Sequence, residues 1–320
     1  MYNSSKGVIM SLPHISKTRK IISQLLTFWI PFKSYRRALR GMLQFGLIKR
    51  MRVLHNDRTK QFEHELAIGA IMKDEGPYLK EWLDFHILVG VSKFYLYDNG
   101  STDNTTQILK PYIERGIVEY HYFPGTRKQL PAYLEIINNH SNDTRWLALI
   151  DLDEFLVPVN HETVPEFLHT MPDFAQLIVT WVIYGSSGHK TKPDGLLMEN
   201  YKYHAKNTFG IKAIVNPRLL VKYTCLHQNL VAGWTIDNNG KKLGRTHQST
   251  NPPAYNNLRL NHYYTKSYEE YMAKFKRGTA TGQSSDYRSA EKFKQYDRNE
   301  IYDDIMDKYI EKLHAIYSGK

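Results

Sequence analysis

The stretch WLALIDLDEF, residues 146–155, decides how the rest of the chain is interpreted. Residues 146–150 are an apolar run typical of a buried strand, and three carboxylates follow them at once. Asp151 and Asp153 would point the same way if the chain stayed extended, and two such acids repel each other unless a cation lies between them. This pattern favours a divalent-metal site that holds a diphosphate. A polar loop whose acids cap the next element is the alternative.

The segment before this motif alternates between strands and helices. Apolar runs predict strands at residues 66–72, 94–97, 117–123 and 145–150. Helices are predicted at residues 77–90, 103–112 and 130–137. This alternation implies an α/β fold with a mostly parallel sheet and helices on both faces. The loops carry neither G-x-G-x-x-G nor G-x-x-x-x-G-K-[ST], so no dinucleotide fingerprint or P-loop is expected.

Charged residues follow three of the predicted strands, at the edge where open α/β sheets bind ligands. Residues 73–75 (Lys-Asp-Glu) follow the first strand, Asp98 follows the second, and the acids of the opening motif follow the fourth. Each acid could be a capping residue by itself, as Ser101 or Asp103 is expected to be for the next helix. Their shared edge favours a functional cluster.

The net charge of +11 is concentrated at the N-terminus. Residues 1–60 contain 13 of the 43 Lys and Arg residues but a single acid, Asp57, so the rest of the chain is close to neutral. Binding to nucleic acid needs many basic contacts on the folded body, so nucleic acid is not expected as a partner. The single cysteine, Cys225, excludes an internal disulfide and a thiolate cluster, and it fits a reducing compartment.

The basic segment also carries apolar residues at helical spacing within residues 17–52. Its first apolar run, residues 21–30, has roughly 10 residues against the roughly 20 that cross a bilayer. It lacks a small-residue cleavage site, so no signal peptide is expected. Basic amphipathic helices with Trp and Phe lie in the interface of anionic membranes. The segment predicts a cytoplasmic protein bound peripherally to the inner face of the plasma membrane, or else two surface helices packed on the domain.

Several short motifs occur in order from about residue 65 to residue 277. They are Lys73-Asp74-Glu75 with Glu81-Trp82 and His86, Tyr97-Asp98-Asn99-Gly100-Ser101-Thr102-Asp103, Asp151-Leu152-Asp153-Glu154-Phe155, Trp181 with Gly185-Ser186-Ser187-Gly188-His189, and Asn261-His262-Tyr263-Tyr264-Thr265-Lys266-Ser267. In this order and spacing the chain resembles metal-dependent nucleotide-sugar glycosyltransferases of the GT-A fold, of the family 2-like branch and glycosyltransferase family 92. Residues 30–37 also resemble the start of bacterial surface-polysaccharide transferases.

The resemblance implies a role for each charged residue of the cluster. Asp151 would lie near the ribose and the metal, Asp153 would bind the metal, and His262 would complete the metal shell. Manganese or magnesium is implied, which suits oxygen ligands with one imidazole and a diphosphate. Asp98 would accept a hydrogen bond from the nucleotide. The other contacts to the nucleotide sugar, expected to be a UDP-sugar, are assigned to Lys73, Glu75, Asp103, Lys212 and Lys266, although an ordinary surface lysine is the alternative for the last two.

The resemblance also favours inversion at the sugar carbon, for which a base must take a proton from the acceptor. The Asp of a late Glu-Asp pair, which many family 2 relatives use, is missing between Trp181 and His262. His189, Asp237 and Glu154 are the candidate bases, and Glu154 could instead orient a neighbour or bind the metal. Asp151, Asp153, Glu154 and His189 form the expected catalytic set.

Three units are expected along the chain. They are a basic amphipathic segment (1–60), a GT-A catalytic domain (61–267) and a C-terminal helical tail (268–320). Within the catalytic domain, residues 61–160 would hold the nucleotide sugar, and residues 161–267 would form the acceptor half. Strands are predicted in that half at residues 177–184, 211–215 and 219–223.

The leading interpretation is a hexosyltransferase that acts on a glycan or lipid-linked saccharide acceptor in bacterial surface polysaccharide or lipopolysaccharide synthesis. Its metal would stabilise the negative charge that grows on the leaving nucleoside diphosphate. The sheet and the acids alone also permit another magnesium-dependent phosphate-transfer enzyme, such as a nucleotidyltransferase or phosphohydrolase. A non-enzymatic basic membrane-binding protein is the third interpretation.

Overall fold

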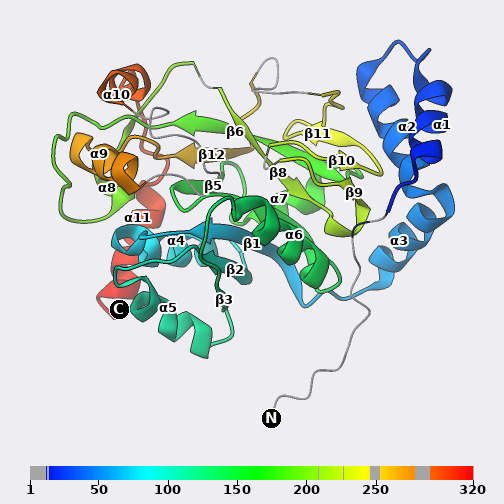
Figure 1. Ribbon diagram of the computed structural model, residues 1–320. Helices are drawn as coiled ribbons and strands as arrows, with labels where there is room; N and C mark the ends of the chain where they lie inside the picture. Colours follow the sequence, from blue (N-terminus) through cyan, green and yellow to red (C-terminus); the bar gives the residue numbers. More distant parts are fainter. Residues whose placement is uncertain are drawn as a thin grey trace.

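The structure, a computed structural model, describes residue 12 and residues 14–207, 209–225, 227–245, 253–277 and 289–319. A central sheet runs through the molecule with helices on both of its faces (Figure 1), which confirms the α/β class. At one end of the molecule lie the N-terminal helices α1 (Lys17–Thr27), α2 (Lys33–Phe45) and α3 (Leu47–Thr59). Toward the other end lie the C-terminal helices α9 (Tyr268–Arg277), α10 (Ala290–Tyr296) and α11 (Asp307–Tyr317).

The first half of the sheet is parallel, with the strand order β3-β2-β1-β4. These strands are β1 (His64–Met72), β2 (Lys93–Asp98), β3 (Val118–Tyr122) and β4 (Thr144–Leu149). The helices between them are α4 (Gly76–Leu88), α5 (Thr105–Glu114) and α6 (Gln129–His140). Pro77 in the first turn of α4, and Gly90 with φ +94° just beyond its end, explain the bounds of that helix.

Strand β1 separates two apolar cores, because successive side chains of a strand point to opposite faces. Ile68 belongs to the core that also contains side chains of α4, α5 and α11. Ala67 and Ile71 belong to the second core, which α6 covers. A Cβ at Gly69 would lie 2.8 Å from Cδ2 of Leu149, so the glycine permits close packing on this face. The predicted arrangement of helices on both faces follows from this alternation.

The second half of the sheet is mixed. Its strands are β5 (Glu154–Pro158), β6 (Gln176–Ile183), β8 (Ile211–Val215), β11 (Thr235–Asp237) and β12 (Leu258–His262). β8 lies antiparallel between β4 and β6, and β12 runs parallel to β6 but antiparallel to β5. The sequence did not predict these antiparallel pairs, because strand–helix alternation stops after α7 (Val164–Thr170) and parallel crossovers are no longer imposed.

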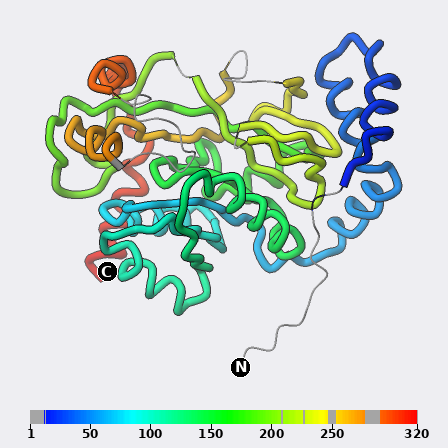
Figure 2. Tube along the Cα trace, viewed as in Figure 1, coloured from blue at the N-terminus to red at the C-terminus, as the bar shows by residue number. Residues whose placement is uncertain are grey.

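The remaining elements are short, and the chain then returns to the first half of the sheet. The short elements are α8 (Leu197–Asn200), β7 (Tyr203–His204), η1 (Pro217–Leu219), β9 (Leu220–Lys222), β10 (Leu230–Val231) and β13 (Ile301–Tyr302). After them α11 packs beside α4, as Figure 2 shows. Leu313 of α11 is buried in the same core as Trp82 of α4, so α11 packs against the first half of the sheet and its helices.

Candidate active site

The acidic motif after β4 turns instead of continuing as an extended strand. Residues 152 and 153 form a turn, and the Glu154 amide donates a hydrogen bond of 3.1 Å to the Asp151 carbonyl. The two aspartates therefore have different partners: Asp151 pairs with Lys212 on β8, and Asp153 pairs with Lys274 on α9. The extended geometry that would have aimed both acids at one spot does not occur.

Glu154 and Lys212 form the buried side of this turn. Lys212 is 1% exposed, and its Nζ lies 2.7 Å from Asp151 Oδ2 and 3.2 Å from Glu154 Oε2. The same Glu154 oxygen accepts from the Asp151 amide at 2.8 Å. Burial raises the pKa of Glu154 to about 7 against the opposing effect of the Lys212 ammonium, and the Asp151 charge adds to the rise. Glu154 therefore positions the turn from the interior, and Lys212 is the internal counter-ion of the motif.

Asp153 faces the other way, toward β12 and α9. β12 pairs with β5 in a register that places His262 opposite Glu154, and His262 Nε2 lies 3.6 Å from Asp153 Oδ1. The Lys274 ammonium contacts the other oxygen, Asp153 Oδ2. Burial alone would raise the pKa of Asp153, but the Lys274 ammonium and the His262 imidazole hold it well below its usual range. Asp153 is thus a carboxylate with Lys274 at one oxygen and the His262 ring near the other.

The implied divalent metal fits part of this arrangement. Within the described residues, no group of three or more His, Cys, Asp or Glu side chains is placed to hold a metal. Asp153 and His262 nevertheless present one oxygen and one nitrogen ligand near the same point, and His262 Nδ1 has no hydrogen-bond partner. Mg²⁺ and Mn²⁺ are commonly held by one or two carboxylates together with substrate phosphates. The pair fits such a shared metal, provided that Lys274 moves off Asp153, whereas Asp151 is engaged by Lys212.

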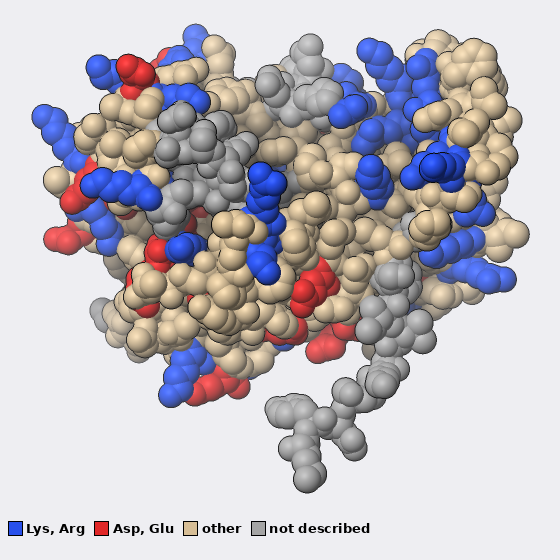
Figure 3. Space-filling model, in the orientation of Figure 1, with Lys and Arg blue, Asp and Glu red and all other residues tan. Residues whose placement is uncertain are grey.

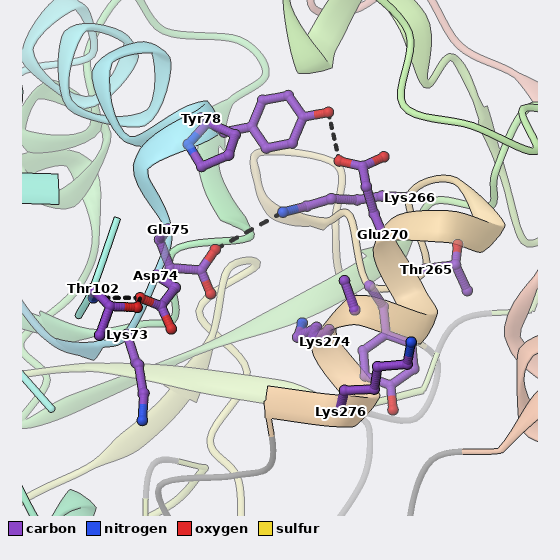
Figure 4. Close-up of a pocket in the computed structure, with 13 residues that line it drawn as sticks. Lys73, Asp74, Glu75, Tyr78, Thr102, Thr265, Lys266, Glu270, Lys274 and Lys276 are labelled. Carbon is purple, nitrogen blue, oxygen red and sulfur yellow. Dashed lines mark hydrogen bonds and ion pairs between the residues drawn. The ribbon is translucent and has the colours of Figure 1, made fainter. Parts of the chain in front are cut away.

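A cavity of about 560 Å³ opens beside Lys274, between the loop after β1 and α9 (Figure 4). Its lining contains four lysines, namely Lys73, Lys266, Lys274 and Lys276. It also contains three acids, namely Asp74, Glu75 and Glu270. A pocket of this volume is the size that takes a small-molecule ligand, and its lysines favour an anionic one.

Lys266 enters the pocket from a strained backbone. Its φ is +53°, a left-handed value that is uncommon for a residue with a Cβ and that concentrates at functional sites. Its Nζ lies 4.0 Å from Glu75 Oε2 and 4.6 Å from the ring centre of Tyr78, as Figure 4 shows. Glu270 is committed to structure, since it accepts from the hydroxyls of Tyr78 at 2.7 Å and Ser267 at 2.6 Å. Lys266 is therefore held in the pocket by a carboxylate and an aromatic ring.

The acids expected to contact the nucleotide mostly hold loops in place. Asp98 is buried, and its two oxygens accept from the Ser101 amide at 2.7 Å and the Tyr120 hydroxyl at 2.8 Å. Asp103 accepts from the Thr105 amide at 3.1 Å and the Gly76 amide at 2.9 Å, so it joins the starts of α4 and α5. Asp98 and Asp103 thus lie at the predicted sheet edge, where they hold the loops next to the pocket. Their contact with a nucleotide stays a prediction.

Two of the candidate bases also have structural partners. His189 Nε2 lies 3.2 Å from the Asn200 carbonyl, and its ring packs edge-on against Tyr201. Asp237 is buried, and it accepts from the amides of Asn239 and Lys241, each at 3.0 Å. Across the described part of the chain, neither residue nor Glu154 lines the cavity.

No sequence motif marks Lys274, Lys276, Glu270 or Tyr78 as a site residue, yet all four line the cavity. Glu270 and Lys274 are four residues apart on α9, so they lie on one face of that helix. This spacing alone is equally typical of any surface helix and does not indicate a site. The expected domain boundary at residue 267 consequently runs through the wall of the pocket.

The profile of glycosyltransferase family 92 matches residues 73–309 of the chain. This segment spans the pocket, both lysine–aspartate pairs and the first three residues of α11. The chain belongs to glycosyltransferase family 92.

Curated relatives agree with this membership. A family 92 protein of Ricinus communis is 25% identical over 226 residues, which cover 68% of this chain and 38% of the relative. A family 92 protein of Arabidopsis thaliana is 23% identical over 238 residues, which cover 70% of this chain and 39% of the relative. A galactan β-1,4-galactosyltransferase of Arabidopsis thaliana is 27% identical over 134 residues, with coverages of 38% and 26%. The chain thus spans about two-fifths of the length of the family 92 relatives.

Among solved structures, TarS 1–349 of S. aureus is similar with a TM-score of 0.33 and 11% sequence identity, over 48% of each chain. A similarity this low adds nothing to the fold or the function of the chain. The family resemblance drawn from the sequence is confirmed by the profile and the curated relatives, and the α/β architecture expected with it is the one observed.

Proposed function

We propose that this chain is the catalytic part of a glycosyltransferase that moves a hexose from a nucleoside diphosphate sugar to a glycan or lipid-linked saccharide. The observation that carries the proposal is the lysine-lined cavity beside the Asp153–Lys274 pair, in a chain of family 92. A UDP-sugar is the first donor to test. A relative named for β-1,4-galactosyl transfer supports galactose as the first sugar.

The lysines of the cavity supply the chemistry that such a donor needs. A sugar transferase must bind a diphosphate and stabilise the charge that grows on it as the sugar departs. Lys266 is held in the cavity by Glu75 and the ring of Tyr78, and Lys274 is held at its edge by Asp153. Groups that are already positioned lose little free energy to reorganisation when the charge develops. Lys73 and Lys276 add positive charge on the same lining.

We assign the metal ligands of this proposal to Asp153 and His262. A manganese or magnesium ion held there with the donor diphosphate would act as a Lewis acid toward the leaving group. Glu154 holds the turn that carries Asp153, because its Oε2 accepts a hydrogen bond from the Asp151 amide at 2.8 Å.

Inversion and the pathway are the remaining parts of the proposal. Inversion is supported by family membership. We propose that neither His189 nor Asp237 is the base that it needs, because both have structural partners and neither lines the cavity. Bacterial surface polysaccharide or lipopolysaccharide synthesis on the cytoplasmic side is supported only by the resemblance of residues 30–37.

Product analysis tests the proposed function. The purified chain would be incubated with a panel of UDP- and GDP-sugars and Mn²⁺, and the nucleotide product identified by chromatography. We expect release of a nucleoside diphosphate from one donor, reduced by chelation and by Asp153→Asn. Release of pyrophosphate or free phosphate, or no donor consumption across the panel, would contradict the proposal.

A further inference from the structure

Helix α1 packs with its polar side inward and its apolar side outward. Within α1 the buried residues are Ser23 and Thr27, and Thr27 is 0% exposed. The large apolar side chains of α1 and the turn after it are all exposed, up to 68% for Phe28 and 69% for Trp29. They are Ile21, Ile22, Leu25, Leu26, Phe28 and Trp29. This is the reverse of the orientation that water favours for an amphipathic helix.

Hydrogen bonds hold α1 in this reversed orientation. Gln44 Nε2 on α2 donates to Ser23 Oγ at 2.9 Å, and Arg40 Nη2 donates to Thr27 Oγ1 at 3.2 Å. The polar groups that face α2 are thereby satisfied, so rotating α1 to bury its apolar side would leave them unpaired. The contacts between α1 and α2 therefore keep the apolar stripe, which consists of the six exposed residues named above, on the outside. An exposed stripe of this kind marks a surface that contacts another apolar phase.

Positive charge surrounds the stripe. Exposed lysines and arginines lie on all three N-terminal helices, including Lys17, Lys20, Lys33, Lys49 and Arg52. Figure 3 shows Lys and Arg side chains gathered over the end of the molecule where α1 to α3 lie. The only acid of residues 1–60, Asp57, is paired with Arg218 at 2.8 Å. A second copy of this surface would bring like charges together, whereas an anionic lipid surface would complement it.

We propose that the outward face of α1, with the basic residues around it, docks the protein onto an anionic lipid surface. None of the described helices is long and apolar enough to cross a membrane. The apolar stripe would therefore lie in the plane of the interface, with its side chains among the acyl chains and the lysines at the headgroups.

The N-terminal helices are fixed to the catalytic body, so lipid docking would orient the whole domain. Arg37 Nη2 donates to the Asn229 carbonyl at 2.7 Å, and Arg50 Nε donates to the Ala232 carbonyl at 2.9 Å. A Cβ at Gly41 would lie 1.9 Å from the Val231 carbonyl oxygen, so only glycine permits this approach of α2. Helix α9, which carries Lys274, lies toward the opposite end of the molecule in Figure 1. Lipid docking would consequently leave the proposed donor pocket open to solution.

Vesicle sedimentation tests the proposal independently of transferase activity. The full chain would be mixed with phosphatidylcholine vesicles with or without phosphatidylglycerol. The double variant Leu25→Gln, Trp29→Gln would be compared with Ile316→Gln, which changes an exposed apolar residue of α11. We expect binding that requires phosphatidylglycerol and weakens with salt. The affinity of the double variant for the vesicles should be at least about tenfold lower, since it lacks two inserted apolar side chains. Ile316→Gln should bind like the unaltered protein.

Two further measurements keep the outcome interpretable. Thermal melting should show equal stability for all three proteins, because every substituted side chain is exposed in water. Sedimentation equilibrium should show a monomer in each case. Absence of binding to anionic vesicles, or unchanged binding by the double variant, would overturn the proposal. So would a dimer that dissociates in the double variant, because the stripe would then be an interface between copies.

Discussion

Two lysine–carboxylate pairs flank the turn at residues 151–154, and they differ in what surrounds them. Lys212 pairs with Asp151 from inside the sheet, where the residue is 1% exposed and also contacts Glu154. Lys274 pairs with Asp153 from α9 and also lines the cavity. The comparison shows that the same residue types serve two purposes. The first pair stabilises the turn, and the second presents charge where a ligand can reach it.

The largest effect is expected from removing the buried lysine. Lys212→Met should lower the free energy of unfolding by about 4 kcal/mol, because it leaves Glu154 and Asp151 without their buried counter-ion. Urea unfolding would measure the loss. Lys274→Met is the matched variant, and its loss should be clearly smaller because Lys274 is partly exposed. Equal losses in the two variants would remove the distinction between the pairs.

Stability should depend on pH through Glu154. Its folded-state pKa of about 7 lies above the usual value of 4.5, so between these values the folded chain keeps a proton that the unfolded chain has lost. The free energy of unfolding should therefore fall as pH rises through this window, by up to about 3 kcal/mol. Burial also raises the pKa of Glu81 to about 7, so Glu81 adds a fall of the same sign in this window. Glu154→Gln should therefore remove only the share due to Glu154, and an unchanged slope in the variant would contradict the raised pKa of Glu154.

The pKa of Asp153 is lowered, whereas that of Glu154 is raised, and a substitution at Asp153 should mainly affect activity. Asp153→Asn should lower the transfer rate on the order of a hundredfold or more, because it removes the negative charge that holds Lys274 and that is proposed to bind the metal. Asp237→Asn is a matched control, since it changes a buried aspartate that closes a turn outside the cavity lining. Its rate should stay close to that of the unaltered protein. A large loss in Asp237→Asn would instead revive Asp237 as the base.

Much of the fold could be predicted from the sequence, because the relevant patterns are local. Each apolar run up to residue 150 that was predicted as a strand is a strand, and the helix at residues 77–90 is bounded by its own Pro and Gly. The order of the second half could not be predicted in this way. Which strand β8 joins, and in which direction, depends on packing between distant segments once the helix crossovers stop.

The candidate site was predicted at its sheet edge but not in its contacts. The opening motif and Asp98 lie at one end of the sheet, as strand endings predicted. His262, which only the family resemblance suggested, lies at the same end. Lys274 was missed because its contact with Asp153 joins residues 121 positions apart. The outward orientation of the apolar side of α1 could not be predicted either. Periodicity identifies an apolar stripe, but it does not show which side of the helix faces α2.

The central claim is that the cavity beside Lys274 binds the diphosphate of a nucleotide sugar, and titration calorimetry with UDP and Mn²⁺ tests it most directly. The unaltered protein should bind UDP, and Lys274→Met should bind it about tenfold more weakly, since it loses one charged contact to phosphate. Lys110→Met, on the exposed side of α5, should bind like the unaltered protein. Equal affinity in Lys274→Met, or no binding of UDP or of any other nucleoside diphosphate, would contradict the claim.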